Sequence, residues 1–381
     1  MTKKELERRN RPWLRTEALV VTLELKALLT QKPPAGYRVE YLAWMVHWII
    51  QKSEDYRWFT NVHSDELKAK IGSDYARYRD WLIDHGIVEL NPIYSTGTPT
   101  GGKAFSKSLR VCGLDYSPNS KPLVVFQRQL ARFSPLEDNS ELTDEVSRYV
   151  HRCLGELTVR ETLVPISNEV RAAFALEASK RVFSGCFNVR YGTHSPRLFH
   201  SVIQMVKEAR RNLMFRRGPA KLVYCDIQSC FPNLLPFWIH KDDEKRRWVE
   251  LLKGDVYEHI RKVQTSQCSR DDIKRQFSKL LSDPDHRSNS ATGEFLRVYF
   301  PDVFRRIESE RSMALELQSK EAEIVVKGLC GWAATQGRWI VPMHDGFLCK
   351  DHDSKELCDR LKMVFREKVG HEPNVGIEVL E

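Results

Sequence analysis

The sequence lacks the signatures of several common protein classes. None of its nine cysteines stands in a Cys-x-x-Cys pair, which argues against a zinc ribbon or zinc finger and favours reduced, mostly buried thiols. It has no apolar run long enough to cross a membrane, and its first residues, Met-Thr-Lys-Lys-Glu-Leu-Glu-Arg-Arg, do not begin a leader. It also has no internal repeat and no low-complexity segment. We therefore expect an intracellular, cytoplasmic protein without a membrane partner.

The composition is that of an ordinary folded protein with a basic surplus. Hydrophobic residues make up 41% and charged residues 29% of 381 positions, so a large buried core and two domains are expected. The 60 Lys and Arg residues outnumber the 51 Asp and Glu residues, which gives a formal net charge of +9. This surplus favours a polyanionic partner but does not identify one, because many basic proteins have none.

A short apolar run ends at a carboxylate past the middle of the chain. Residues 221–235 read Lys-Leu-Val-Tyr-Cys-Asp-Ile-Gln-Ser-Cys-Phe-Pro-Asn-Leu-Leu. A continuous apolar run favours a buried strand, although its length alone also permits a helix. Because Pro232 cannot donate to a β-ladder, we expect the strand to end near Phe231 and to hold Asp226 at its exit.

A second stretch places another aspartate between two apolar runs. Residues 338–350 read Arg-Trp-Ile-Val-Pro-Met-His-Asp-Gly-Phe-Leu-Cys-Lys. Because glycine tolerates positive φ, the pattern predicts a hairpin that turns through Gly346 and carries Asp345 at its tip. Two aspartates at strand ends can share one site, as in enzymes that hold two divalent metals about 3.5–4 Å apart for phosphoryl transfer.

Both stretches resemble known polymerase motifs. Asp-x-x-Ser-x-Phe-Pro, which begins at Asp226, resembles motif A of nucleic-acid polymerase palms, and His344-Asp345-Gly346 resembles motif C of the family A DNA polymerases. The resemblance implies a palm in which Asp226 and Asp345 are catalytic and bind two Mg²⁺ or Mn²⁺ ions. It also implies that His344 approaches the primer terminus. From the residues alone, either aspartate could instead be a helix cap or a turn former.

Two further pieces lie between these motifs in the order that the family has. Arg270-x-x-x-Lys274 on a predicted helix resembles the fingers helix that grips the incoming triphosphate, and one helical turn puts both cations on one face. Residues 317–323, Leu-Gln-Ser-Lys-Glu-Ala-Glu, resemble the helix that precedes motif C. The four pieces together span residues 185–381. The alternative for Arg270 and Lys274 is a solvated helix face.

The resemblance implies roles for four more side chains. Phe231 would lie under the sugar and exclude a 2′-OH, although a core phenylalanine explains the residue equally well. Gln318 would reach the minor groove of the template–primer, or else be an ordinary exposed residue of its helix. Arg210 and Arg211, at the end of a helix predicted over residues 198–213, would hold template or triphosphate. Otherwise these arginines complement the dipole of that helix.

The sequence also departs from the family pattern. Family A usually has a glutamate where this chain has Phe231, and another where it has Gly346, so a third carboxylate is missing. The family pattern continues after the fingers lysine with aromatic residues, where this chain has Ser278 and Ser282. These departures put base stacking by the fingers in doubt and leave the choice of sugar open.

The N-terminal region follows the order of a winged helix-turn-helix. Its predicted elements are a helix over residues 38–52, a short strand at 58–60, helices over 64–71 and 74–85, and strands over 87–90 and 104–111. A Gly/Pro/Thr-rich stretch between the last two strands would form the wing. The first 15 residues make a basic arm that either contacts phosphates or frays.

The second helix of this motif is expected to face a nucleic acid. It would present Tyr75, Arg77, Tyr78 and Arg79 outward, and Lys103 would extend from the wing, a set suited to phosphates and base edges. Three alternatives remain open. The tyrosines pack against a neighbouring helix, the arginines form a solvated face, or the winged helix binds protein.

Taken together, the patterns predict an α+β protein in which a winged helix-turn-helix joins a polymerase-like palm with helical fingers. The predicted domains are residues 1–112, a linker over 113–140 and the palm and fingers over 141–381. The expected function is metal-dependent nucleotidyl transfer by a small DNA polymerase in replication or repair of a mobile element, with DNA and nucleoside triphosphates as partners. The alternatives are a non-enzymatic DNA-binding regulator with a degenerate palm, or a primase-like enzyme that makes RNA.

Overall fold

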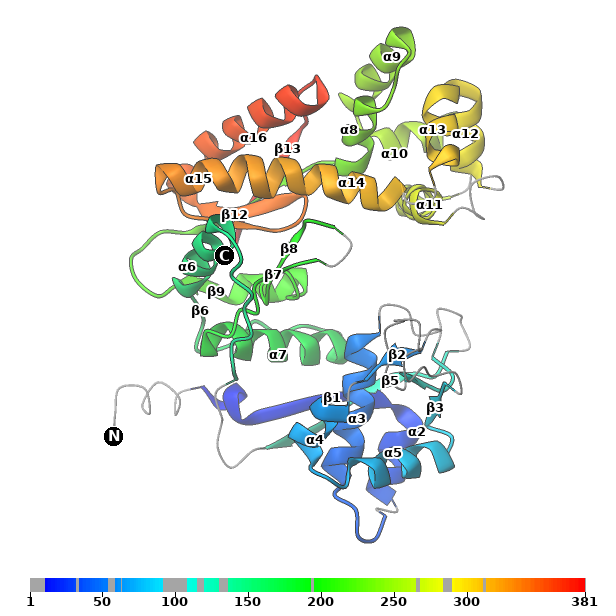
Figure 1. The fold of residues 1–381 in the computed structure, drawn as a ribbon, viewed down its shortest axis with the longest axis vertical. Coiled ribbons are helices and arrows are strands. Elements are labelled where there is room, and N and C mark those ends of the chain that lie inside the picture. Colours follow the sequence, from blue (N-terminus) through cyan, green and yellow to red (C-terminus); the bar gives the residue numbers. More distant parts are fainter. Residues whose placement is uncertain are drawn as a thin grey trace, which may run out of the picture. The chain divides into compact units, whose positions relative to one another are not determined.

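The chain divides into two units, and each contains both helices and strands (Figure 1), in agreement with the predicted mixed fold class. One unit consists of Met1–Ser134 and Glu161–Glu177, and the other of Pro135–Arg160 and Ala178–Glu381. The computed structural model describes residues 11–31, 34–53, 59–62, 64–91, 108–114, 120–129, 136–192, 195–264, 268–283, 290–310 and 313–380. Most of the predicted basic arm therefore lies outside the described residues.

The first unit is built on two small antiparallel sheets. Its helices are η1 (Pro12–Arg15), α2 (Leu23–Gln31), α3 (Val39–Lys52), α4 (Ser64–Ile71), α5 (Tyr75–Asp84) and the first part of α7 (Glu169–Ser184). Its strands are β1 (Thr16–Thr22), β2 (Thr60–Asn61), β3 (Val88–Leu90), β4 (Ser108–Val111) and β5 (Leu123–Gln129). One sheet pairs β1 with β5, and the other has the order β2-β4-β3. The apolar face of α3 supplies much of the core.

The segment predicted as a linker contains a strand of this first unit. β5 lies within residues 113–140 and pairs with β1 along its whole length, from Thr16 opposite Gln129 to Thr22 opposite Leu123. On the other edge of β1, the Val20 amide donates a hydrogen bond of 3.0 Å to Nδ1 of the buried His47. The observed unit boundaries thus differ from the predicted ones, because β5 finds its partner about a hundred positions away in the sequence.

The helix α5 does not present both of its tyrosines outward. Tyr78 is buried, and its ring makes edge contacts with Tyr37 and Tyr41 at centroid distances of 5.4 and 5.5 Å. The outward orientation predicted for Tyr78 is therefore wrong, and the alternative of packing against a neighbouring helix holds for this residue. An aromatic ring in a mostly polar helix packs inward because it removes a large apolar area from water.

The second unit carries a four-stranded sheet surrounded by helices. Its helices are α6 (Glu145–Gly155), the second part of α7, η2 (Lys207–Asn212), α8 (Cys230–Leu234), η3 (Leu235–Phe237), α9 (Asp242–Leu252), α10 (Val256–Val263), α11 (Arg270–Ser282), α12 (Ala291–Tyr299), α13 (Pro301–Ser309), α14 (Met313–Ala322), the π-helix η5 (Glu323–Cys330), α15 (Gly331–Gln336), η6 (Asp351–Asp353) and α16 (Ser354–Val369). Its strands are β6 (Leu157–Val159), β7 (Arg190–Tyr191), β8 (Leu198–Phe199), β9 (Leu213–Phe215), β10 (Leu222–Ile227), β11 (Ile340–Pro342), β12 (Gly346–Lys350) and β13 (Val375–Leu380).

The central sheet is antiparallel, with the strand order β11-β12-β10-β13. β10 is an inner strand, and each of its residues is buried or half-buried, which explains why they form a nearly continuous apolar run. Pro342, which has no N–H to donate, lies in the edge strand β11. α16 packs against β10 and β12, and α14, η5 and α15 follow one another in a single line (Figure 1).

Two predicted elements of this unit have different bounds. β10 ends at Ile227, four residues before the predicted end at Phe231, and Pro232 lies in the first turn of α8, where no intrahelical hydrogen bond is lost. The helix predicted over residues 198–213 is also wrong, because β8, the 3₁₀-helix η2 and the start of β9 occupy that segment. Local charge and spacing favoured a helix there, but pairing of β8 with β7 and of β9 with β6 prevails.

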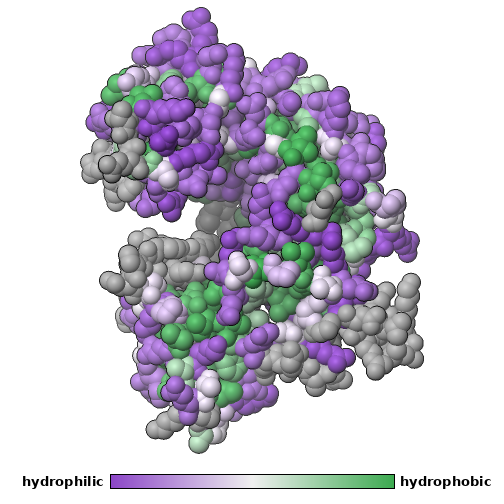
Figure 2. Space-filling model, turned by 180° about the vertical axis from the view of Figure 1, so that it is seen from behind, coloured by the Kyte–Doolittle hydropathy of each residue, from purple (hydrophilic) through white to green (hydrophobic). Residues whose placement is uncertain are grey.

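The surface and the thiols agree with the composition. On the face seen in Figure 2, hydrophilic residues dominate and hydrophobic residues form separate patches. All nine cysteines are free thiols and seven of them are buried, as predicted. Within the described parts of the chain, every helix is too short or too polar to cross a lipid bilayer.

Candidate active site

The two predicted aspartates lie on neighbouring strands. Asp226, near the end of β10, pairs across the ladder with Gly346, the first residue of β12. Asp345 immediately precedes that glycine, and its carbonyl oxygen accepts a hydrogen bond of 3.0 Å from the Ile227 amide. The Met343 amide donates to the Gly346 carbonyl at 2.7 Å and closes the turn of the hairpin. The fold therefore brings both carboxylates to one end of the central sheet.

At two positions next to Asp226 only glycine fits, because the neighbouring strand leaves no room for a Cβ atom. A Cβ atom at Gly346 would lie 2.3 Å from the Cys225 carbonyl oxygen, and one at Gly376 would lie 2.8 Å from Asp226 Oδ1. The positive φ expected at Gly346 is wrong, because the left-handed residue of the turn is His344, with a φ of 64°. Such strain in a non-glycine residue persists only where the surrounding structure fixes it.

The surroundings of Asp226 and Asp345 disfavour the ionised form of both carboxyl groups. Burial raises the pKa of Asp226, with the Glu378 carboxylate adding to the rise and Lys207 opposing it. Burial also raises the pKa of Asp345 to about 6, and the charge of Asp226 adds to that rise. The ammonium of Lys274 opposes the rise in pKa at both carboxylates. Two like charges in a partly buried place favour the binding of a proton or a cation.

The raised pKa of Asp345 makes a prediction for the metal-free protein. Its pKa is about 6 in the folded state against 3.8 for the free side chain, so the folded state binds the proton more tightly. The resulting stabilisation is complete below the unfolded pKa and is lost as the pH rises through about 6. In EDTA, raising the pH from 4 to 7 is therefore expected to lower the free energy of unfolding of the wild type more than that of Asp345→Asn. Urea denaturation at each pH measures this difference, and parallel curves would contradict it.

Cations on η2 lie beside the carboxylates. Lys207 Nζ is 2.7 Å and the Arg211 guanidinium 3.9 Å from the Glu378 carboxylate on β13. The Arg210 guanidinium carbon lies 5.7 Å from the centre of the Tyr224 ring on β10, the residue that pairs with Glu378 across the ladder. Of the two arginines predicted to hold template or triphosphate, Arg210 thus lies next to β10, the strand that carries Asp226, and Arg211 next to β13, which pairs with it.

The two predicted triphosphate ligands on α11 differ in their surroundings. Lys274 is exposed and acts electrostatically on both aspartates, as described above. Arg270 Nε instead lies 2.5 Å from Asp255 Oδ2. Asp255 is also the N-cap of α10, where it accepts hydrogen bonds from the Tyr257 and Glu258 amides. Arg270 would have to leave this pair to reach a ligand.

Sequence reasoning missed a buried ion pair next to Asp345. Glu321, on α14, is 1% exposed and accepts two hydrogen bonds from Arg197, at 2.8 Å from Nε and 2.6 Å from a terminal nitrogen. Burial raises the pKa of Glu321 to about 7, against the opposing charge of Arg197. The spacing of the sequence could have indicated that Glu321 is buried. It follows Leu317 by four residues and precedes Ile324 by three, both of them buried, so it lies in the apolar stripe of its helix.

The β7–β8 hairpin packs against the turn that carries Asp345. The ring of Phe199 makes an edge contact with His344 at 5.4 Å, and the buried His200 donates from Nε2 to the Pro342 carbonyl at 2.8 Å. Burial lowers the pKa of His344 to about 4, so this imidazole is neutral at pH 7. Its Nδ1 atom is buried and has no hydrogen-bond partner in the described structure. His344 is thus a neutral, largely buried imidazole next to Asp345 in the sequence.

Phe231 and Gln318 are both partly buried near this pair. Phe231 lies on α8, and the Arg197 guanidinium carbon is 5.8 Å from the centre of its ring. Gln318 lies on α14, three residues before Glu321 and thus on a neighbouring part of the same helix surface. α14 packs against α8 and α11, so these elements form one wall around the aspartates.

The donor set is suited to a hard divalent cation that also binds substrate. No group of three or more His, Cys, Asp or Glu side chains arranged to hold a metal occurs among the described residues. Mg²⁺, however, is commonly bound by one or two carboxylates together with substrate phosphates. Asp226 and Asp345, with their raised pKa values and their oxygen ligands, fit that mode of binding.

The predicted nucleic-acid contacts of the first unit are only partly available. Arg77 is exposed, and its guanidinium carbon lies 4.3 Å from the centre of the Tyr37 ring. Arg79 is 17% exposed and pairs with Asp80 at 2.6 Å. Lys103 lies outside the described residues. Arg77 is therefore the better candidate for a phosphate contact.

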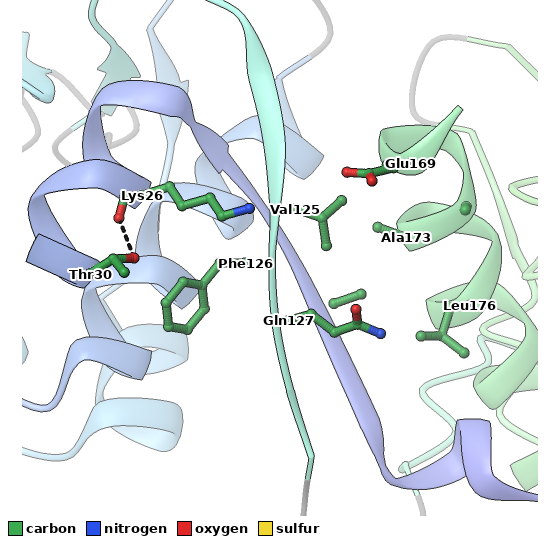
Figure 3. A pocket seen from close by; sticks show the side chains of 10 residues that line it. Lys26, Thr30, Val125, Phe126, Gln127, Glu169, Ala173 and Leu176 are labelled. Atoms are coloured by element: carbon green, nitrogen blue, oxygen red, sulfur yellow. Dashed lines mark hydrogen bonds between the residues drawn. The ribbon is translucent and has the colours of Figure 1, made fainter. Parts of the chain in front are cut away.

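A cavity of about 460 Å³ lies in the first unit beside β5 (Figure 3). Lys26 on α2 and Glu169 on α7 lie on opposite sides of the strand, and Val125, Phe126 and Leu176 supply apolar lining. None of the residues predicted to act in catalysis or nucleic-acid binding lines it. Its polar groups belong to separate elements and do not converge on one point (Figure 3), so it is not the candidate site.

Comparison with known proteins finds a likeness in structure alone. No protein-family model matches the sequence, and no curated protein does. Among solved structures, the chain is similar to the POL domain of Pol1 from M. smegmatis in complex with DNA primer-template and dNTP, with a TM-score of 0.42 and 12% sequence identity. The match covers 55% of this chain and 51% of that chain, so the chain spans about half the length of that structure.

Proposed function

We propose that the protein is a metal-dependent nucleotidyltransferase, and more specifically a small DNA polymerase. The observation that carries the proposal is the placement of Asp226 and Asp345 on neighbouring strands at one end of a sheet, each with a raised pKa. Bound there, two Mg²⁺ or Mn²⁺ ions would neutralise the charge that develops during phosphoryl transfer. The basic side chains of Lys207, Arg210 and Lys274 around the aspartates support a polyanionic substrate.

The chain's own residues then bind and orient the nucleotide. Lys274 is placed to attract the triphosphate towards the aspartates, and Arg270 joins it once it leaves Asp255. Phe231 lies under the sugar and, having no polar atom, selects deoxynucleotides by excluding the 2′-OH through contact. His344, whose imidazole is neutral at pH 7, would approach the primer terminus, and its place next to Asp345 supports that role.

An incorporation assay tests this function directly. The purified full chain is incubated with a labelled primer–template and either deoxy- or ribonucleotides, with Mg²⁺, with Mn²⁺ or with EDTA. We expect metal-dependent extension with deoxynucleotides. Extension with ribonucleotides alone, or without a primer, would favour the primase-like alternative. No extension under any of these conditions would favour a DNA-binding regulator with a degenerate palm.

We further propose that the first unit contains a winged helix-turn-helix that binds nucleic acid. The order α3, β2, α4, α5, β3, β4 and the sheet order β2-β4-β3 support this assignment. α5 would be the recognition helix, and the segment between β3 and β4, which includes Lys103, would be the wing. Arg77, exposed on α5, supports contact with phosphate.

Replacing Arg77 and Arg79 by alanine is expected to weaken DNA binding and to reduce its dependence on salt. Each phosphate contact contributes about 0.9 to the slope of log K against log salt concentration, so the slope should fall by about one to two. Arg77 should account for most of the change, because Asp80 already neutralises Arg79. Fluorescence anisotropy with a labelled duplex over a range of salt concentrations measures the slope. Lys26→Ala, on α2, is the control, and an unchanged slope in the Arg77 variant would show that this helix does not contact the backbone.

A further inference from the structure

The half-buried Arg197 contacts three elements near the aspartates. Its backbone is fixed by the β7–β8 hairpin, where its carbonyl accepts a hydrogen bond of 2.9 Å from the Gly192 amide. Its guanidinium is bound through two nitrogens to Glu321 on α14, and the same group lies 5.8 Å from the centre of the Phe231 ring on α8. The ion pair therefore connects the hairpin, α14 and the helix that carries the expected sugar contact.

The geometry of this pair restricts the guanidinium to one orientation. Two parallel hydrogen bonds to a carboxylate fix the plane of an arginine, which a single charge contact does not. A cation within about 6 Å of a ring centre attracts the face of the ring, so a fixed guanidinium also favours one position of Phe231. Glu321 is almost fully buried, at 1% exposure. The free-energy cost of burying its charge is offset only while both hydrogen bonds from Arg197 are made.

We propose that Glu321 is a positioning residue for sugar selection, which holds Arg197 against Phe231 and so keeps the ring in the path of a 2′-OH. This inference rests on the proposed function, because it assigns a role within the same nucleotide site. Exclusion by contact depends on a ring that cannot move aside, and the sequence offers no polar group at position 231 to select the sugar in another way. A purely structural pair would instead stabilise the unit without any effect on the choice of sugar.

The test compares Glu321→Gln with the matched control Glu323→Gln. Glutamine keeps the size of the side chain but replaces one acceptor with a donor, so one of the two hydrogen bonds from Arg197 is lost. Glu323 lies two residues further along the same helical rod and pairs with Lys320 and Lys368 at the surface. The measured quantity is the ratio of kcat/KM for deoxynucleotide to kcat/KM for ribonucleotide. We expect Glu321→Gln to lower this ratio by about tenfold and to change kcat with deoxynucleotide by less than about threefold, because a ring that is less firmly held weakens the steric exclusion of the 2′-OH without removing it. Glu323→Gln should leave the ratio unchanged.

A double-mutant cycle with Phe231→Ala shows whether Glu321 acts through the ring. Phe231→Ala alone should lower the ratio strongly, and adding Glu321→Gln to it should then have no further effect, because coupled residues are not additive. Additive effects on the ratio, or a ratio in Glu321→Gln within twofold of the wild type, would overturn the proposal.

If Glu321→Gln does not fold, the apolar replacement of both partners, Glu321→Leu with Arg197→Met, removes the pair without leaving a buried charge. The same loss of selectivity is expected there.

A binding measurement separates this inference from the proposed function. Equilibrium titration of the wild type and Glu321→Gln with dATP and ATP in the presence of Ca²⁺ reports nucleotide preference without turnover. If the wild type extends no primer but prefers dATP, and Glu321→Gln loses that preference, the catalytic proposal fails and the positioning role stands. If the wild type binds neither nucleotide, both proposals fail. If the wild type extends primers and Glu321→Gln selects between deoxy- and ribonucleotides as the wild type does, only the positioning role fails.

Discussion

Asp226→Asn and Asp345→Asn are each expected to reduce nucleotide incorporation by at least about a thousandfold, which is about 4 kcal/mol of transition-state stabilisation. Asparagine keeps the shape of each side chain and removes the negative charge that a divalent cation needs. Because burial raises the pKa of both carboxylates, with Glu378 adding to the rise at Asp226 and Asp226 adding to the rise at Asp345, loss of either charge should not destabilise the fold. We expect the melting temperature of each metal-free variant to equal or exceed that of the wild type at pH 7. Single-turnover extension assays and thermal denaturation measure the two effects.

The control for this pair is Asp359→Asn, which changes an aspartate of α16 that is 60% exposed and pairs with Lys355 at 3.3 Å. It should extend primers at the rate of the wild type. Loss of activity together with unchanged or increased stability would indicate that the two aspartates serve to bind a cation and not to stabilise the fold. Near-normal extension by either folded aspartate variant would rule out joint metal binding at this end of the sheet.

Gly346→Ala is expected to abolish most activity by displacing both aspartates at once. The added Cβ would lie 2.3 Å from the Cys225 carbonyl oxygen and 2.9 Å from Asp226 Cα, so β10 and β12 must separate locally. A displacement of about 1 Å at a reacting group can reduce the rate about a hundredfold, and overpacking of this kind usually costs about 1–3 kcal/mol of stability. We therefore expect a loss of kcat larger than the loss of stability explains. Extension kinetics below the melting temperature of the variant separate the two.

Gly155→Ala is the matched control, because a Cβ at Gly155 meets no atom within 4 Å. It should change neither kcat nor the melting temperature appreciably. If Gly346→Ala retains the kcat of the wild type, then the close approach of the two strands is not needed to position the aspartates, and the geometry of the proposed site would have to be revised.

The parts of the site that sequence could predict are those in which local pattern and tertiary structure agree. The apolar run before Asp226 and the paired apolar runs around Asp345 are strands because each is short, buried and bounded by turn residues. Even here, the reason for the glycine in the turn differs from the predicted one, which was its tolerance of positive φ. Gly346 is needed because β10 approaches closely, which depends on a partner strand that the local sequence does not reveal.

The parts that sequence could not predict depend on contacts between distant segments. Arg197 and Glu321 are 124 positions apart, and neither has a local signal for its partner. Tyr78 packs inward against two other tyrosines, Tyr37 just before α3 and Tyr41 on α3. Periodicity gives the face of a helix that is apolar, but it does not say which other element will cover that face.

The π-helix η5 determines where this part of the chain tolerates a change of length. A π-helix bonds residue i to i+5, one residue more per turn than the α-helix, so a residue deleted between 323 and 330 can be absorbed by tightening to α geometry. α14 and α15 would then keep the faces that they present. A deletion between Leu317 and Glu321 in α14 cannot be absorbed in this way, because successive α-helical residues are about 100° apart around the axis. It would therefore carry Leu317 off the face that it shares with Glu321. Among homologous chains, single-residue deletions in this rod should therefore fall within η5, while the length of α14 stays constant.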